Sequence, residues 1–309
     1  MGNLVCVSGD FCSGSTLVFT LFRETGQYHC LYEPLHEHLR EYLVYGLRAH
    51  EDSHHFFVGN YHRELRGFGD AGALFDPRWG TSCLYIPPDA PADRLYRYLS
   101  CIIDMSFERR SRVMLKENRL AFRLEWFRRR FPQAAIVHVH RSREGQWQSI
   151  LRRVQAYHRR EDVGQDSADF NGFGMARWCD DVAPIHPELE RRHSRTGFER
   201  FSKLWALSFE EHRRHADVSI AYEDLLGDFE SVMKRLWKAI DGPDVEFVRL
   251  RRLVVPRVRQ DHFAAEAAKR PMAGARRWMD RALRRYAALR VRADDVWRSR
   301  GRLPADPLA

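Results

Sequence analysis

Short apolar runs separated by helical patterns organise most of the chain. Four runs are typical of buried strands, at 4–7, 113–115, 135–139 and 218–221. A helical pattern begins at Ser15, and others cover 120–130, 144–157, 198–215 and 229–240. Because strands alternate with helices, we predict a parallel central sheet in a three-layer α/β/α fold, whose ligands gather at the carboxyl ends of the strands.

Three other segments lack these patterns. Residues 50–92 are rich in His, Gly and Pro and are expected to form an irregular insertion or lid. Residues 159–197 are polar and are expected to form a second loop excursion, and both segments should shape the substrate side. The basic segment 256–309 is predicted to be helical in part, over 273–289. Without repeats or a second core, residues 1–309 are expected to form one domain.

The loop between the first strand and the first helix, GDFCSGST, resembles a phosphate-binding loop without its lysine. Gly9 and Gly14 stand at the glycine positions of G-x-x-x-x-G-K-[ST] and Thr16 at its hydroxyl, but Ser15 replaces the lysine. In a strand–loop–helix arrangement, backbone N–H groups point at a bound anion. We therefore predict phosphate binding, with a plain strand-to-helix turn as the alternative. The missing lysine and the lack of a magnesium-binding Asp argue against a kinase of the Walker type.

A second candidate anion contact follows the third apolar run. That run delivers Arg141 to its carboxyl end, and Ser149 lies eight residues later within the next helix. Arginine carries a planar, permanently charged group that suits phosphate. An isolated Arg at this place would more often cap the sheet edge, but together with the glycine loop it predicts a second phosphate contact.

The loop and the Arg–Ser pair together resemble the PAPS-dependent sulfotransferases, where PAPS is 3′-phosphoadenosine 5′-phosphosulfate, and in particular their carbohydrate-type branch. The resemblance covers residues 4–245 and extends to four further stretches, YEPLHE at 32–37, LKENR at 115–119, FPQAAIVHVHR at 131–141 and IAYEDLLGD at 220–228. It implies a P-loop-like sulfotransferase fold and an enzyme that moves the sulfuryl group of PAPS to an acceptor hydroxyl. A sulfuryl donor has no β- and γ-phosphates for a Walker lysine to hold.

The resemblance also implies roles for particular residues. Arg141 and Ser149 would hold the 3′-phosphate of PAPS, and a late basic loop at 269–276 would cover it. 3′,5′-Adenosine bisphosphate would be the product. The phosphosulfate would lie on the glycine loop, at Phe11, Cys12, Ser13, Gly14, Ser15 and Thr16.

The family often carries an Arg in the loop where this chain has Cys12. The cation that faces the bridging oxygen must then come from elsewhere, and we favour Lys116 over Arg119 and Arg23. The same departure motivates a second hypothesis, a protein that binds PAPS or adenosine bisphosphate but has lost transfer activity. A P-loop kinase is a third and weaker hypothesis.

Sulfuryl transfer to an alcohol must remove the hydroxyl proton, which requires a base within hydrogen-bond reach. By resemblance, Glu33 in YEPLHE is the candidate base, and the alternative is a glutamate ion-paired to arginine. His36 and Glu37 are the other candidates for this role, and with Arg119 they are assigned to the acceptor side. The acceptor is expected to be a carbohydrate or glycosylated small molecule, with a lipid, a phenol or another secondary metabolite as the alternatives.

Composition narrows the partners only broadly. The chain has 51 Lys and Arg against 42 Asp and Glu, a net charge of +9, which favours anionic ligands without choosing among them. The basic runs fall on helical patterns and suit solvated faces, so we expect no nucleic-acid partner. His138 and His140 could share one face of a strand, but without a well-spaced third ligand we expect no metal.

The six cysteines lack metal-ligand spacing and are interpreted as free thiols of a reducing compartment. The chain runs directly into its first strand and has no apolar run near membrane-spanning length. These features predict a cytoplasmic protein without a membrane partner. Its oligomeric state does not follow from the sequence.

Overall fold

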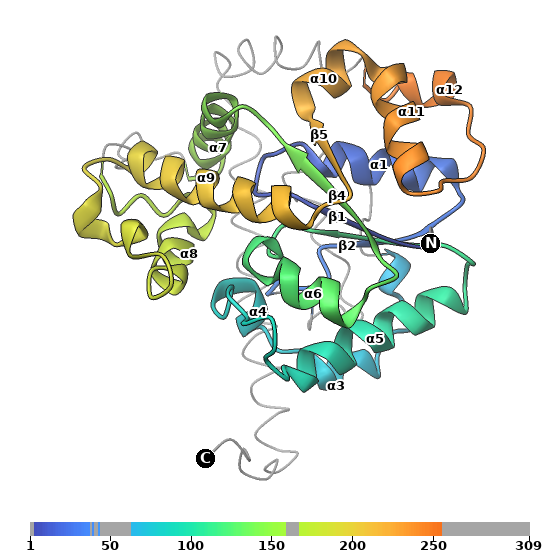
Figure 1. The fold of residues 1–309 in the computed structure, drawn as a ribbon, viewed down its shortest axis with the longest axis horizontal. Helices are drawn as coiled ribbons and strands as arrows, with labels where there is room; N and C mark the ends of the chain where they lie inside the picture. Colours follow the sequence, from blue (N-terminus) through green and yellow to red (C-terminus); the bar gives the residue numbers. More distant parts are fainter. Residues whose placement is uncertain (1–2, 38, 40–42, 44–62, 159–166, 255–309) are drawn as a thin grey trace, which may run out of the picture. The chain divides into compact units, whose positions relative to one another are not determined.

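The structure is a computed structural model, and its central sheet has five parallel strands in the order β2-β3-β1-β4-β5. Figure 1 shows this sheet with the helices around it. The structure describes residues 3–37, 39, 43, 63–158 and 167–254, which all belong to the unit Met1–Pro256. The predictions for 50–62, 159–166 and 256–309, including the late basic loop, lie outside these described residues. The strands are β1 Leu4–Ser8, β2 His29–Tyr32, β3 Val113–Glu117, β4 Ala135–His140 and β5 Val218–Ala221.

The four strands expected from apolar runs are confirmed, and β2 is an addition. Its four residues, HCLY, lack a continuous apolar run, because His29 is polar and the strand is short. β2 nevertheless pairs with β3 along its length, from His29 opposite Val113 to Tyr32 opposite Lys116. β3 is longer than predicted and continues through Lys116, which also lies opposite Val7 of β1.

Helices connect the strands and cover the sheet. Their bounds are α1 Ser15–Thr25, α3 Ala71–Leu74, α4 Arg78–Thr81, α5 Asp93–Phe107, α6 Leu124–Arg130, α7 Arg143–His158, α8 Met175–Val182, α9 Gly197–His215, α10 Tyr222–Gly227, α11 Phe229–Ala239 and α12 Phe247–Arg251. The helix expected over 120–130 starts instead as a 3₁₀ turn, Ala121–Arg123, because the backbone at Phe122 leaves helical geometry. The expectation of an irregular segment at 159–197 is wrong in part, since it contains α8.

Alternating strand residues build the three layers. In β1, Val5 and Val7 join a cluster with α1 and α11, whereas Leu4 and Cys6 join another with α5 and α6. This is the period of two that a strand imposes on its side chains. The predicted three-layer α/β/α fold with a parallel sheet is therefore confirmed.

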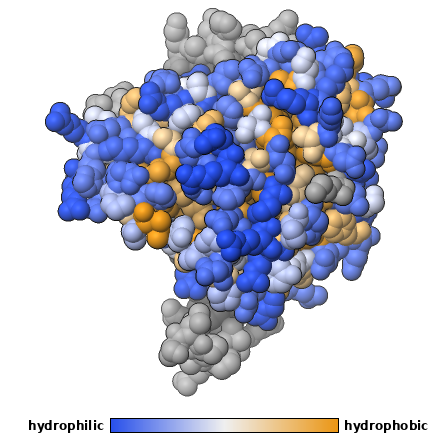
Figure 2. All heavy atoms as spheres, viewed as in Figure 1, coloured by the Kyte–Doolittle hydropathy of each residue, from blue (hydrophilic) through white to orange (hydrophobic). Residues whose placement is uncertain are grey.

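A third apolar cluster joins α7, α8 and α9 beside the carboxyl end of β1. Trp147, Trp178 and Phe201 are buried there, and Phe11 of the glycine loop packs against this cluster. The face in Figure 2 is mainly hydrophilic, with apolar residues in scattered groups. Across the described segments, no helix combines the length and the apolar character needed to cross a bilayer.

Candidate anion and transfer site

The glycine loop leaves β1 and passes directly into α1. A Cβ on Gly9 would lie 2.1 Å from the Val139 carbonyl oxygen, so only glycine lets the loop run this close to the end of β4. Gly14 has φ +99° and a Cβ there would lie 2.3 Å from the Tyr222 ring. Both glycines are thus required by geometry, one by close approach and one by a left-handed backbone.

The N-terminus of α1 is built to face a negative charge. Gly14 caps the helix without a side-chain hydrogen bond, and the first turn contains no acidic residue. Helical hydrogen bonding starts at Leu17, whose N–H donates to the Gly14 carbonyl over 2.8 Å, so the earlier amides lie at the positive end of the helix dipole. Ser13 is buried, and in the described chain its Oγ has no hydrogen-bond partner.

Arg141 lies just beyond β4 with its side chain 15% exposed. Its guanidinium stacks over the Tyr222 ring at 4.9 Å from the centroid, and its Nε is 3.9 Å from Glu223 Oε1. That separation exceeds a hydrogen bond, and Nε is buried with no partner among the described residues. Tyr222 therefore touches both the loop, at Gly14, and the predicted phosphate-binding arginine.

Helix α7 presents Ser149 on the face that covers Arg141. A Cβ on Gly145, in the first turn, would lie 3.0 Å from Arg141 Nε. Ser149 is four residues further, on the same side of the helix and one turn along. Gln146 of that turn donates to the Phe11 carbonyl oxygen over 2.7 Å and so ties α7 to the glycine loop. The two predicted phosphate contacts thus lie on connected elements.

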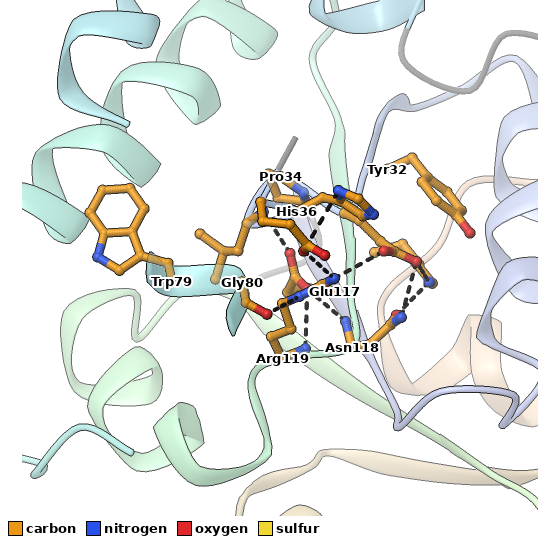
Figure 3. Close-up of polar contacts among 12 residues, drawn as sticks. Tyr32, Pro34, His36, Trp79, Gly80, Glu117, Asn118 and Arg119 are labelled. Atoms are coloured by element: carbon orange, nitrogen blue, oxygen red, sulfur yellow. Dashed lines mark hydrogen bonds and ion pairs between the residues drawn. The ribbon is translucent and has the colours of Figure 1, made fainter. Parts of the chain in front are cut away.

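A compact polar cluster occupies the adjacent carboxyl ends of β2 and β3. Glu33 is 5% exposed and adopts φ 42°, a left-handed backbone that turns the chain at the end of β2. Its Oε1 accepts from Lys116 Nζ at 2.5 Å and from Asn118 Nδ2 at 3.0 Å. Its Oε2 accepts from the Arg119 guanidinium at 3.0 Å. Among the described residues, three donors thus hold the predicted base. Figure 3 shows Asn118 and Arg119 within this network of polar contacts.

Lys116 is 1% exposed and bridges Glu33 to the side-chain oxygen of Asn118. Burial lowers the pKa of its ammonium, and Glu33 works against that decrease. A cation held in this manner stays charged only as long as an anion remains beside it. The charge of Lys116 and the charge of Glu33 therefore depend on one another.

Arg119 connects the cluster to the predicted acceptor side. It donates to Glu37 Oε2 at 2.9 Å and to the Gly80 carbonyl oxygen at 3.1 Å. Burial opposes its charge, but the carboxylates of Glu33, Glu117 and Glu37 raise its pKa above the ordinary value. Glu37 and its neighbour His36 are the more accessible members, with side chains 30% and 27% exposed.

Glu117 is the carboxylate of this cluster that binds backbone N–H groups. It is 1% exposed, and its carboxylate accepts hydrogen bonds from the backbone N–H groups of Leu35, Asn118 and Arg119 over 2.8–3.1 Å. Burial raises the pKa of Glu117, and the charge of Arg119 opposes that increase. Glu117 therefore fastens the segment after β2 to the segment after β3.

Two aromatic residues join the cluster to the glycine loop. The Tyr32 ring lies 4.5 Å from Lys116 Nζ, and its hydroxyl contacts Thr16 Oγ1 at 3.1 Å. The Phe11 ring lies 5.4 Å from the Arg119 guanidinium. The structure thus brings the predicted loop, base and substitute cation together. Arg23, the other cation considered, binds Glu64 through two hydrogen bonds of 2.8 Å.

The strand histidines belong to the core. His138 stacks on His212 with ring centroids 4.2 Å apart, and His212 Nε2 lies 2.8 Å from Ser8 Oγ. Burial lowers the pKa of His138 and lowers that of His212 to about 4. Within the described ranges, no group of three or more His, Cys, Asp or Glu side chains is placed to hold a metal ion. All six cysteines are free.

Sequence reasoning missed Tyr32, Asn118 and Tyr222 as members of the site. Each lies inside a stretch that carried the resemblance, and Tyr32 and Asn118 stand directly beside the candidates Glu33 and Arg119. The neighbours of Glu33 and Arg119, and the residue directly after the last predicted strand, were therefore a signal that could have found them. Their roles depend on contacts between segments far apart in sequence.

Comparison with known proteins yields a weak structural likeness. No protein-family model and no curated protein matches the chain. Among solved structures, sulfotransferase STF1 from Mycobacterium tuberculosis H37Rv has a TM-score of 0.47 at 16% identity, covering 82% of this chain and 71% of that one. Sulfotransferase STF9 from Mycobacterium avium has a TM-score of 0.46 at 13% identity, covering 84% and 68%. Similarity at this level does not assign a function, which rests on the geometry of the site.

Proposed function

We propose that the protein is a sulfotransferase that uses PAPS as donor and a hydroxyl group of a carbohydrate or glycosylated small molecule as acceptor. The observation that carries this proposal is the Glu33–Lys116 ion pair of 2.5 Å beside a lysine-free phosphate loop. The contact of Tyr32 with both Lys116 and Thr16 supports a single site. An acid–base pair next to an anion loop suits transfer of a charged group to a hydroxyl.

The residues present fit a donor with two anionic ends. Ser13 Oγ and the amides at the start of α1 suit the phosphosulfate, and the residues that would hold it are 11–16. Arg141, whose Nε lacks a hydrogen-bond partner among the described residues, and Ser149 suit the 3′-phosphate. When bound, PAPS supplies the sulfuryl group, and 3′,5′-adenosine bisphosphate is released.

The ion pair suggests how Glu33 acts as a base although it is surrounded by donors. Overall, the acceptor oxygen forms a bond to sulfur, the bond from sulfur to the bridging oxygen breaks, and the hydroxyl proton passes to Glu33. Lys116 stabilises the negative charge that develops on the bridging oxygen. As the ammonium turns from Glu33 towards that oxygen, Glu33 loses a cation and becomes more basic.

Arg119 and Glu37 then have different roles on the acceptor side. Arg119 retains Glu117 and Glu37 as anionic partners, so it keeps Glu33 oriented while Lys116 moves. Glu37 and His36 are accessible enough to bind acceptor hydroxyl groups. The donor and acceptor sides therefore meet at Glu33.

A second candidate is a PAPS- or bisphosphate-binding protein without transfer activity. The pairing of Glu33 with both Lys116 and Arg119 favours it, because two cations make a carboxylate a weak base. Cys12 in the loop agrees with the same idea. The two candidates share the donor site and differ only in turnover.

The test separates these functions. Titration calorimetry with 3′,5′-adenosine bisphosphate, with ATP as comparator, measures the donor site, and release of bisphosphate from PAPS across an acceptor screen measures transfer. Tight bisphosphate binding with turnover supports the enzyme. Binding without turnover supports the second candidate. If ATP binds more tightly than the bisphosphate and is hydrolysed with magnesium, the P-loop kinase is correct instead.

A further inference from the structure

A carboxyl group stands inside the loop proposed to bind an anion. Asp10 directly follows Gly9, and its backbone carbonyl accepts a hydrogen bond from the Ser13 N–H over 3.2 Å. The residue is intermediate in exposure, and its Oδ1 accepts from the hydroxyl of Ser208 in α9 over 2.7 Å. Within the described chain, Asp10 forms no ion pair. A negative charge here would repel the anion that the loop is proposed to hold.

Among the described residues, the groups next to Asp10 do not supply a compensating cation. Ser208 is neutral, and His212 Nδ1 lies 2.7 Å from the Ser208 carbonyl oxygen, which requires the proton on that nitrogen. Burial lowers the pKa of His212 to about 4, so near pH 7 the ring is neutral and its Nε2 accepts from Ser8. On β4, burial lowers the pKa values of His138 and His140.

Among the described residues, the neighbouring loop and strand ends place no cation in an ion pair with Asp10 either. Lys116 and Arg119 at the end of β3 bind the carboxylates of Glu33 and Glu37 instead. Cys12 of the loop brings a thiol and no positive charge. Arg141 is directed at the Tyr222 ring and at Glu223. The described surroundings of Asp10 are therefore polar and include no cation paired with its carboxyl.

Such an environment favours the neutral acid. Burial raises the pKa of Asp10 to about 7, and the hydrogen bond from Ser208 opposes that rise. Near neutral pH the protein therefore holds both protonation states of this carboxyl. An anion in the loop favours the protonated one.

We propose that Asp10 is a residue of the donor site that binds the anion as a neutral carboxylic acid, so that donor binding takes up a proton from solution at this carboxyl. The inference rests on the proposed function, since it requires an anion in the loop. In the neutral form, Oδ1 keeps the hydrogen bond from Ser208, and the acid O–H becomes an additional donor.

The sign of the linkage follows from the two states. Below pH 7 the carboxyl is already protonated, and binding takes up little. Above pH 7 each binding event must add a proton, so affinity falls roughly tenfold per pH unit once the pH exceeds about 8. Uptake at Asp10 approaches one proton, about 0.9 at pH 8 for a pKa near 7.

The experiment is titration calorimetry with 3′,5′-adenosine bisphosphate at pH 6 to 9, in buffers of different ionisation enthalpy, on wild type and Asp10→Asn. The ligand's own protons contribute equally to both proteins, so the difference reports Asp10. We expect about 0.9 more proton taken up by wild type at pH 8. We also expect Asp10→Asn to bind as tightly as wild type at pH 6 and at least tenfold more tightly at pH 9. Asp104→Asn, which removes an exposed carboxylate on α5, is the matched control and should behave as wild type.

Each other outcome is decisive. Binding with equal proton uptake in wild type and Asp10→Asn overturns the role of Asp10 and leaves the proposed function standing. Tenfold weaker binding by Asp10→Asn at pH 6 also overturns it, since a neutral amide should replace a neutral acid at that pH. No binding by either protein at any pH overturns the proposed function itself.

A second variant covers the case in which Asp10→Asn does not fold. Ser208→Ala removes the hydrogen bond that lowers the pKa of Asp10. We expect the pH above which affinity falls to move upward in this variant. An unchanged or lower pH would contradict the inference.

Discussion

The glycine loop and the cluster at the ends of β2 and β3 adjoin each other but differ in whether their buried polar groups have hydrogen-bond partners. In the loop region, Ser13 Oγ and Arg141 Nε are buried without hydrogen-bond partners among the described residues. In the cluster, both oxygens of Glu33 accept donors, and Lys116 and Arg119 each contact carboxylate oxygens. The loop region therefore has donors without partners among the described residues, whereas in the cluster positive and negative side chains neutralise one another.

The difference indicates different tasks. A buried donor without a partner costs free energy unless an external group satisfies it, so the loop region is suited to binding an anion. A neutralised cluster binds no anion strongly but holds its groups in position, and it must exchange partners to act. Binding should therefore depend on the loop side, and turnover on the cluster.

The largest expected effect tests the cluster as the site of turnover. Glu33→Gln keeps the shape of the side chain and removes its charge, so sulfuryl transfer should fall by about 10²- to 10⁴-fold. Bisphosphate affinity measured by calorimetry should change little, because Glu33 belongs to the neutralised region. Glu125→Gln on α6, which removes an exposed carboxylate, is the matched control. Unchanged transfer in Glu33→Gln would show that another group is the base.

Next in size is the stability of the neutralised pair. Lys116→Met leaves Glu33 buried without one of its two cations, and the free energy of unfolding should fall by about 3–5 kcal/mol. Urea unfolding measures this loss. The double variant Glu33→Gln with Lys116→Met should be more stable than Lys116→Met alone, because no unpaired charge is buried. Additive losses would mean that the two charges are not coupled in stability.

The third prediction tests the loop region. Arg141→Ala removes a charged donor and should weaken bisphosphate binding about 10- to 100-fold while ATP binding stays weak. Arg141→Lys should restore only part of the affinity, since an ammonium lacks the planar fork. Arg129→Ala, an exposed arginine of α6, should leave affinity unchanged. Equal affinity in wild type and Arg141→Ala would remove Arg141 from the donor site.

The smallest effect concerns the link between the regions. Tyr32→Phe keeps the ring beside Lys116 and removes the hydroxyl that contacts Thr16, which should cost about 1 kcal/mol of bisphosphate binding. Tyr96→Phe on α5 is a control that alters a partly exposed tyrosine. If Tyr32→Phe instead changes transfer strongly and binding not at all, the hydroxyl serves the cluster alone.

Much of the fold followed from local pattern. The strand, the loop with Gly9 and Gly14, and helix α1 are adjacent in sequence, so period and glycine position sufficed to predict them. Strand β2 was not predicted, because four residues beginning with His29 carry too little periodicity. It is fixed instead by pairing with β3, more than 80 residues away.

Part of the candidate site likewise followed from local sequence, and part depended on contacts between distant segments. The sequence by itself determined the glycine loop and the location of Arg141 after β4, since these depend on neighbouring residues and on the polarity of parallel strands. The tertiary structure alone decided that Lys116 pairs with Glu33, 83 residues away. The physical reason is strand order: β3 lies between β2 and β1, so Lys116 is opposite both Tyr32 and Val7. Burial there makes each charge depend on the partners that the neighbouring strands bring to it.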